Sequence, residues 1–159
     1  GKGDGVFINT AGIGALPAGR RLSATLARPG DRVLISGSMG DHGVAIMAAR
    51  AGLSFDTRIE SDSAALNGLT AVMLAAAPGL RLMRDPTRGG LAAALNEIAQ
   101  ASGVGLRIRE AAIPVQEEVR GACELLGLDP LYVANEGKLM AVVAAEDAPA
   151  LLAAMRAHP

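Results

Sequence analysis

Hydrophobic residues make up 50% of this 159-residue chain, yet only 2% of the chain is aromatic. Two Phe and one Tyr are its only aromatic residues, against 32 Ala and 20 Gly. Such a chain can bury a core, which excludes general disorder. That core is expected to place small aliphatic side chains between closely packed elements. The scarcity of aromatic rings also argues against a surface that stacks the bases of single-stranded nucleic acid.

Charge and cysteine content narrow the class of protein further. Fifteen basic and 16 acidic residues leave a formal net charge of −1, so no charge excess favours nucleic acid or an anionic membrane as a partner. Cys123 is the only cysteine, which excludes an internal disulfide and predicts no metal site and a reducing, cytoplasmic location. The longest uncharged stretch, residues 63–80, contains polar residues and Pro, which favours a buried helix over a membrane span.

The positions of Gly and Pro, which mark turns, predict the order of the helices and strands. β-rich runs occur at residues 32–36, 80–83, 104–109 and 138–145, with a shorter extended piece at residues 6–9. Helical patterns occur at residues 43–50, 63–77, 91–101, 114–126 and 147–155. The predicted fold is α+β, a four-stranded mixed sheet with helices packed on one face, in which residues 138–145 form a central strand.

Capping residues predict where the helices begin and end. Asp41 is expected to cap the helix at residues 43–50, and Ser61 or Asp62 the next one. Pro114 is expected to open the helix that runs to Leu126. The expected terminators are Gly52, Gly103 and Gly127.

The polar turn at residues 85–90 (Asp-Pro-Thr-Arg-Gly-Gly) lies between a predicted strand and a predicted helix. Helix N-termini expose unpaired backbone N–H groups and suit anions. Gly89 and Gly90 would let an anion approach the backbone, and Arg88 could clamp a phosphate. The alternative is an ordinary helix start capped by Asp85 or Thr87.

The turn at residues 36–43 (Ser-Gly-Ser-Met-Gly-Asp-His-Gly) is a second Gly-rich connection from a strand to a helix. His42 in this turn could act as an acid, a base or a hydrogen-bond donor. The alternative is that His42 packs at the first turn of a helix without any chemical role.

Two acidic turns and the cysteine are further candidates. Glu136 precedes the predicted central strand, where it could be a buried base with a raised pKa or belong to a solvated turn. Residues 60–63 (Glu-Ser-Asp-Ser) are first a capping site and second a source of a functional carboxylate. Cys123 lies on a predicted helix with little basic surrounding, which favours a core thiol over a nucleophile.

Taken together, the motifs resemble a known family, the carbamoyl dehydratases of nickel–iron hydrogenase maturation. These belong to the superfamily of aminoimidazole ribonucleotide synthetase and selenophosphate synthetase. The resemblance extends from about Gly3 to the end of the chain. Its motifs are residues 4–14 (Asp-Gly-Val-Phe-Ile-Asn-Thr-Ala-Gly-Ile-Gly), 28–31 (Arg-Pro-Gly-Asp), 36–37 (Ser-Gly), 40–43 (Gly-Asp-His-Gly), 61–62 (Ser-Asp), 85–92 (Asp-Pro-Thr-Arg-Gly-Gly-Leu-Ala) and 134–138 (Ala-Asn-Glu-Gly-Lys).

The resemblance implies a two-domain parent protein. Residues 1–30 would be a linker from an N-terminal domain, and residues 31–159 the C-terminal α+β domain. In that family a C-terminal Pro-Arg-Ile-Cys tail carries the carbamoyl group. The tail is not in this sequence, and Cys123 does not match its cysteine. A homodimer through the N-terminal domain is also implied.

The implied reaction is the ATP-dependent dehydration of an S-carbamoyl cysteine to a thiocyanate. ATP with Mg²⁺ would be the cofactor of the parent protein, with none expected on this fragment alone. The implied partners are the carbamoyltransferase HypF and the HypC–HypD scaffold. The phosphate side would include Asp85, Thr87, Arg88, Gly89 and Gly90. The catalytic side would include Glu136 as the base, with Asp41 and His42 lining the same cleft.

Two other interpretations remain open. The parent could be another synthetase of the same superfamily, such as a selenophosphate or aminoimidazole ribonucleotide synthetase. The chain could instead act mainly as a docking module for maturation partners.

Overall fold

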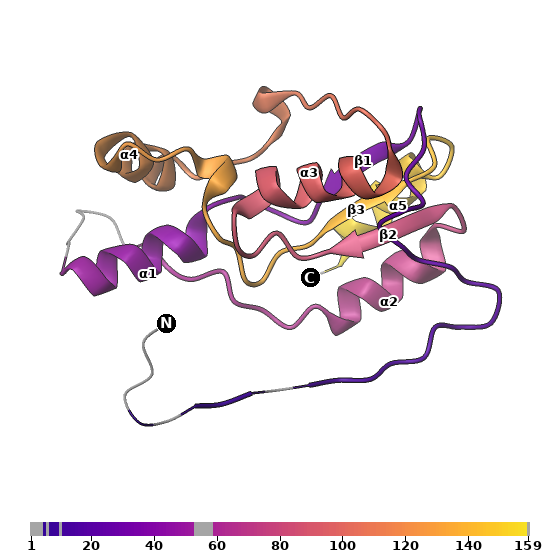
Figure 1. Ribbon diagram of the computed structural model, residues 1–159, viewed down its shortest axis with the longest axis horizontal. Helices are drawn as coiled ribbons and strands as arrows, with labels where there is room; N and C mark the ends of the chain where they lie inside the picture. Colours follow the sequence, from indigo (N-terminus) through magenta and orange to yellow (C-terminus); the bar gives the residue numbers. More distant parts are fainter. Residues whose placement is uncertain (1–4, 6, 10, 53–58, 159) are drawn as a thin grey trace.

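The computed structural model describes residue 5 and residues 7–9, 11–52 and 59–158. The described residues form three strands and five α-helices. Figure 1 shows the helices arranged around one small sheet. In chain order the elements are β1 (Arg32–Ile35), α1 (Asp41–Ala51), α2 (Asn67–Ala76), β2 (Leu80–Arg84), α3 (Gly90–Ser102), the 3-10 helix η1 (Glu110–Ala112), α4 (Glu117–Leu126), the 3-10 helix η2 (Pro130–Tyr132), β3 (Met140–Val143) and α5 (Ala148–Ala157).

The sheet has the order β1-β3-β2, and both pairings are antiparallel. The last strand in sequence is therefore the central one, as its apolar run predicts. All four of its residues are buried. The register places Val143 opposite Arg32 in β1 and opposite Leu80 in β2, with an irregularity between Leu80 and Leu82.

The four-stranded mixed sheet is a wrong prediction. Residues 104–109 form no strand, so the sheet described here has three strands, all antiparallel. Their backbone begins with the N–H of Val104 donating to the carbonyl of Ala99, a bond that completes the end of α3. Alternation of apolar and basic side chains marks a strand only where a neighbouring strand completes the hydrogen-bond ladder. Within the described residues, none pairs with this segment.

The helices cover both faces of the sheet, which corrects the prediction of helices on one face. Ala141 and Val143 of β3 pack with α2 and α5, while Met140 and Val142 pack with α3. In Figure 1, α2 and α3 accordingly lie on opposite sides of the strands. A strand that is apolar at every position is typical of burial on both faces, and β3 is such a strand.

A third cluster joins α1 to α4 beside the sheet, on the left of Figure 1. Its buried members include Val44 of α1, Val119 and Cys123 of α4, and Val133 of the segment that precedes β3. This cluster holds the start of α1 against the segment that leads into β3.

The helix C-termini predicted from the sequence agree with the structure better than the predicted N-termini do. Left-handed glycines at positions 52, 103 and 127 follow α1, α3 and α4, as predicted. Three predicted starts are wrong, while α3 and α5 begin within one residue of their predicted starts. Gly40 rather than Asp41 is the N-cap of α1, α2 begins at Asn67 without a cap from Ser61 or Asp62, and α4 begins three residues after Pro114. The side chains of Ser61 and Asp62 instead make contacts with residues far away in the sequence.

The N-terminal segment runs beside the other elements without regular structure (Figure 1). Phe7 and Ile8 are exposed, and of the extended piece predicted at residues 6–9, Val6 lies outside the described residues. Arg20 fixes the end of this segment by donating to the carbonyls of Ala77 and Pro78, each at 3.0 Å. Among the described residues, no helix is long and apolar enough to cross a membrane.

Candidate functional site

Asn135 connects three loops at one end of the sheet. Its side chain is fully buried. Its Oδ1 accepts a hydrogen bond from the backbone N–H of Gly40 at 2.8 Å, and its Nδ2 donates to the carbonyls of Pro86 and Val133 at 3.0 and 3.1 Å. Buried amides require such partners. The turn before α1, the turn before α3 and the segment before β3 are therefore held together by one side chain.

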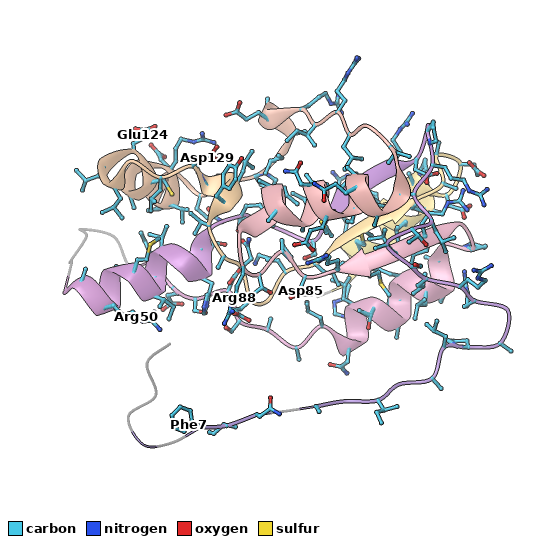
Figure 2. The ribbon with its side chains drawn as sticks, viewed as in Figure 1. Phe7, Arg50, Asp85, Arg88, Glu124 and Asp129 are labelled. Carbon is cyan, nitrogen blue, oxygen red and sulfur yellow. The ribbon has the colours of Figure 1, made fainter. Side chains whose placement is uncertain are left out.

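The turn before α3 contains five of the predicted site residues. Gly89 and Gly90 have φ values of +75° and +63°, and a Cβ on Gly90 would lie 2.4 Å from the carbonyl oxygen of Leu131. Glycine is thus required at position 90 by both conformation and space. Asp85 accepts a hydrogen bond from the hydroxyl of Thr87. Asp85 and Arg88 are exposed, and Figure 2 shows them on the same loop.

The N-terminus of α3 is suited to an anion. No side chain caps it, and its first turn contains no acidic residue. The Gly90 N–H donates to the carbonyl of Thr87, and neither a capping side chain nor an acidic residue in the first turn offsets the positive end of the dipole. The start of α1 differs, because Asp41 lies in its first turn. Of the two Gly-rich turns, the one before α3 is the better match to a phosphate.

Asp41 is buried, with 8% of its surface exposed. One carboxylate oxygen, Oδ2, accepts a hydrogen bond from the Ser38 hydroxyl. The other, Oδ1, has no hydrogen-bond partner among the described residues. A buried carboxylate oxygen without a partner is costly, so Oδ1 is an unsatisfied acceptor beside the start of α1.

His42 and Glu136 face each other, although they are 94 positions apart in the sequence. His42 Nε2 lies 3.9 Å from Glu136 Oε1, and the side chains are 21% and 44% exposed. His42 Nδ1 lies 2.8 Å from the hydroxyl oxygen of Ser61. The pair is assembled because Gly43 of α1 donates to the carbonyl of Ala134, which brings α1 beside the segment before β3.

Asp62, which the sequence predicts mainly as a helix cap, contacts the same candidate group. Its side chain is 3% exposed, and its Oδ2 lies 3.7 Å from Lys138 Nζ. Its Oδ1 accepts from the backbone N–H of Glu136 at 3.3 Å. No pattern in the sequence separates this role from a helix cap, because the apolar residues Ala64, Ala65 and Leu66 follow Asp62 almost directly.

The predicted site residues thus form two groups. One is the turn of residues 85–90, and the other contains Asp41, His42 and Glu136. Asn135 connects the loops that carry them. Within the described part of the chain, no hydrogen bond or ion pair joins one group directly to the other.

Residues 28–159 match the family described as AIR synthase related protein, C-terminal domain. The chain belongs to this family. The match begins just before β1 and includes every helix and strand described above. Both candidate groups therefore lie inside the AIR synthase-related domain.

Individual relatives are closely similar to this AIR synthase-related domain. The carbamoyl dehydratase HypE of Cupriavidus necator is 66% identical over 159 residues, which is 100% of this chain and 45% of that protein. A crystal structure of the hydrogenase maturation protein HypE in complex with ATP has a TM-score of 0.83 and 51% identity, over 86% of this chain and 41% of that one. A crystal structure of the HypE–HypF complex has a TM-score of 0.84 and 50% sequence identity, over 86% of this chain and 45% of that one. The chain spans about half the length of the curated relatives that it matches.

Cys123 lies apart from both groups, on the α4 side of the domain. It is 1% exposed and packs in the cluster between α1 and α4. Burial raises the pKa of the Cys123 thiol above its ordinary value, and the Asp129 carboxylate raises it further. A protonated, buried thiol is a poor nucleophile, as expected of a core residue. No group of three or more metal-binding side chains occurs among the described residues.

Proposed function

We propose that this chain is the C-terminal part of an ATP-dependent carbamoyl dehydratase of hydrogenase maturation. Its substrate would be an S-carbamoyl cysteine, and its product a thiocyanate. One observation carries the proposal. The side chain of Asn135 binds both the turn before α1 and the turn before α3. It thereby connects the N-terminus of α3, which is suited to phosphate, to the segments that carry the His42–Glu136 pair. The similarity to HypE over the whole chain supports the same assignment.

The turn before α3 is assigned to the phosphates of ATP. The N–H groups at the start of α3 would bind phosphate oxygens. Gly89 is exposed and would let those oxygens approach the backbone. Gly90 is assigned to the phosphate side through the turn that it forms against the Leu131 carbonyl. Arg88 is exposed and could clamp a phosphate. Asp85 and Thr87 hold each other at the beginning of the turn. Mg²⁺ is assigned to accompany the ATP, as it ordinarily does.

ATP, when bound, supplies a phosphoryl group that turns the carbamoyl oxygen into a good leaving group. The protein must then remove protons from the carbamoyl nitrogen as the C–N triple bond forms. Glu136 is assigned as the base, because its carboxylate is partly exposed and faces His42. Asp41 is assigned to line the same cleft, where its unsatisfied buried oxygen would be an acceptor for a carbamoyl N–H group.

The parent protein is assigned the organisation that the sequence predicts. Residues 1–30 would be the linker and residues 31–159 the C-terminal domain, with homodimerisation through the other domain. HypF would deliver the carbamoyl group, the HypC–HypD scaffold would receive the nitrile, and the cytoplasm would be the location. The isolated chain is expected to be inactive, since it spans only about half the length of its curated relatives.

The test is the intact mass of the full-length protein during turnover with HypF, carbamoyl phosphate and ATP. The wild type should gain a carbamoyl group and then lose one water when ATP is present. Glu136→Gln should stop at the carbamoyl stage, with the rate of water loss at least about 100-fold lower. Glu124→Gln is the matched control, because Glu124 is exposed on α4 (Figure 2) and should leave the rate unchanged.

Two results would contradict the proposal. A wild-type mass that never changes, while HypF modifies a control acceptor, would exclude the dehydratase and favour a sister synthetase. A Glu136→Gln protein that loses water at the wild-type rate would exclude Glu136 as the base.

A further inference from the structure

Two adjacent residues, Ser61 and Asp62, contact both members of the His42–Glu136 pair. Ser61 contacts the imidazole of His42, and Asp62 contacts the backbone N–H of Glu136. The segment that carries them has no helical or strand structure. It is held by specific contacts to the segment before β3 rather than by regular hydrogen bonding.

The contacts of Ser61 fix the orientation of the imidazole. Because the Glu136 carboxylate faces His42 Nε2, we assign the proton of the neutral ring to that nitrogen. Nδ1 is then an acceptor, and the Ser61 hydroxyl donates to it at 2.8 Å. Ser61 Oγ itself accepts from the backbone N–H of Ser63 at 3.3 Å. The bond from Ser63 thus holds the Ser61 hydroxyl in the orientation in which it donates to the imidazole ring.

The contacts of Asp62 fix the backbone of the base. Its carboxylate is almost fully buried, with Oδ1 on the N–H of Glu136 and Oδ2 facing Lys138. Its main chain is packed so tightly against Gly137 that a Cβ there would lie 1.6 Å from the Asp62 carbonyl oxygen. Asp62 therefore contacts three consecutive residues, Glu136, Gly137 and Lys138.

We propose that Ser61 and Asp62 are positioning residues, which set the orientation of His42 and the location of the Glu136 carboxylate. This inference rests on the proposed function only for its catalytic consequence. A base displaced by about 1 Å costs on the order of 100-fold in rate. Loss of either contact should therefore lower kcat, while KM for ATP stays the same because the turn before α3 is untouched.

The first test uses NMR on this chain and needs no activity. His42 and His158 are its only two histidines, so their imidazole ¹⁵N signals can be assigned by substitution. Ser61→Ala should shift the Nδ1 signal of His42 and leave His158 unchanged, and Ser61→Thr should restore the wild-type signal. Identical His42 signals in all three proteins would overturn the role of Ser61.

Hydrogen exchange of the Glu136 amide tests Asp62 in the same samples. Asp62→Ala should speed that exchange at least about 10-fold, since the buried acceptor is removed. Asp62→Asn retains an oxygen for the amide and loses only the charge that faces Lys138, so it should stay near wild type. If Asp62→Ala fails to fold, Asp62→Leu is measured beside Asp62→Asn instead. A wild-type exchange rate of the Glu136 amide in a folded Asp62→Leu protein would overturn the inference.

The second test measures turnover in the full-length protein. Ser61→Ala should lower kcat about 10- to 100-fold with KM for ATP unchanged, and Ser61→Thr should recover most of the loss. Thr70→Ala is the hydroxyl-deletion control, because among the described residues the Thr70 hydroxyl bonds only to the Asn67 carbonyl of its own helix. A Ser61→Ala enzyme with wild-type kcat would overturn the catalytic part of the proposal.

The two tests separate this inference from the proposed function. NMR changes with no dehydration by the wild type would contradict the function alone. Wild-type dehydration with unchanged NMR signals in Ser61→Ala would contradict the positioning role alone.

Discussion

At the scale of single residues, close contacts decide what this domain tolerates. Gly137 and Gly90 both lie where a Cβ would overlap backbone atoms, at 1.6 and 2.4 Å. Both residues hold loops that carry candidate site residues. The sequence shows glycines at these positions, but some other glycines, such as Gly121, have open space around them. Which glycine is indispensable therefore depends on what packs against it.

A pair of alanine substitutions tests this distinction. Gly137→Ala should lower the free energy of unfolding by about 2–3 kcal/mol, because the new methyl group must displace the backbone of Asp62. Gly121→Ala should raise it by about 0.5–1 kcal/mol, because Gly121 is exposed within α4 with nothing nearby. Urea unfolding followed by circular dichroism measures both. Equal effects of the two substitutions would contradict the tight contact at Gly137.

At the scale of elements, α1 and α4 pack together through small side chains beside the sheet. Val44 and Val119 are fully or almost fully buried between them, next to Cys123. In Figure 2 the labelled Glu124 and Asp129 lie on this side of the domain. The pairing supports the site indirectly, since α1 carries His42 and its first turn meets the segment before β3.

The buried thiol of Cys123, between α1 and α4, should make the domain less stable to unfolding at alkaline pH. Burial raises the folded-state pKa of Cys123 above its ordinary value of 9.0, so the unfolded chain loses this proton first. The stabilisation is complete below about pH 9 and is lost as the pH rises toward the folded-state pKa. Cys123→Ala should remove this part of the alkaline decline in unfolding free energy. Urea unfolding at pH 7 to 10.5 measures it, and parallel declines in the two proteins would contradict the prediction.

At the scale of the whole molecule, one buried amide joins parts of the chain that are 95 positions apart. Asn135 connects the Gly40 turn, the Pro86 turn and the segment before β3. The two candidate groups are therefore set in place by the same side chain. Their relative position belongs to the tertiary structure and not to either loop.

Asn135→Asp tests this connection, because it preserves shape and removes both donors. The free energy of unfolding should fall by about 2–4 kcal/mol, since a buried carboxylate oxygen would face the carbonyls of Pro86 and Val133. Asn96→Asp is the matched control on the surface of α3, where, within the described part of the chain, the side-chain amide donates only to the Ala92 carbonyl. It should change stability by less than about 0.5 kcal/mol. Similar losses for the two variants in urea unfolding would exclude Asn135 as the connecting residue.

Local signals in the sequence were sufficient to predict much of the secondary structure of this domain. Apolar runs and terminating glycines predict the five helices, the central position of β3 and the turn before α3. The reason is that helix ends and buried strands depend on nearby residues, through backbone conformation and the pattern of side chains. The motifs likewise single out Glu136 and His42 before any contact is known.

Only the tertiary structure decided the number of strands, the faces that the helices cover and the assembly of the site. Residues 104–109 alternate like a strand, yet no strand among the described residues pairs with them. Ser61 and Asp62 have the composition of a helix cap, but their side chains bond to His42 and Glu136 instead. Polar side chains and strand edges take the best partner that the fold supplies. That partner is distant in sequence, so local sequence patterns do not reveal it.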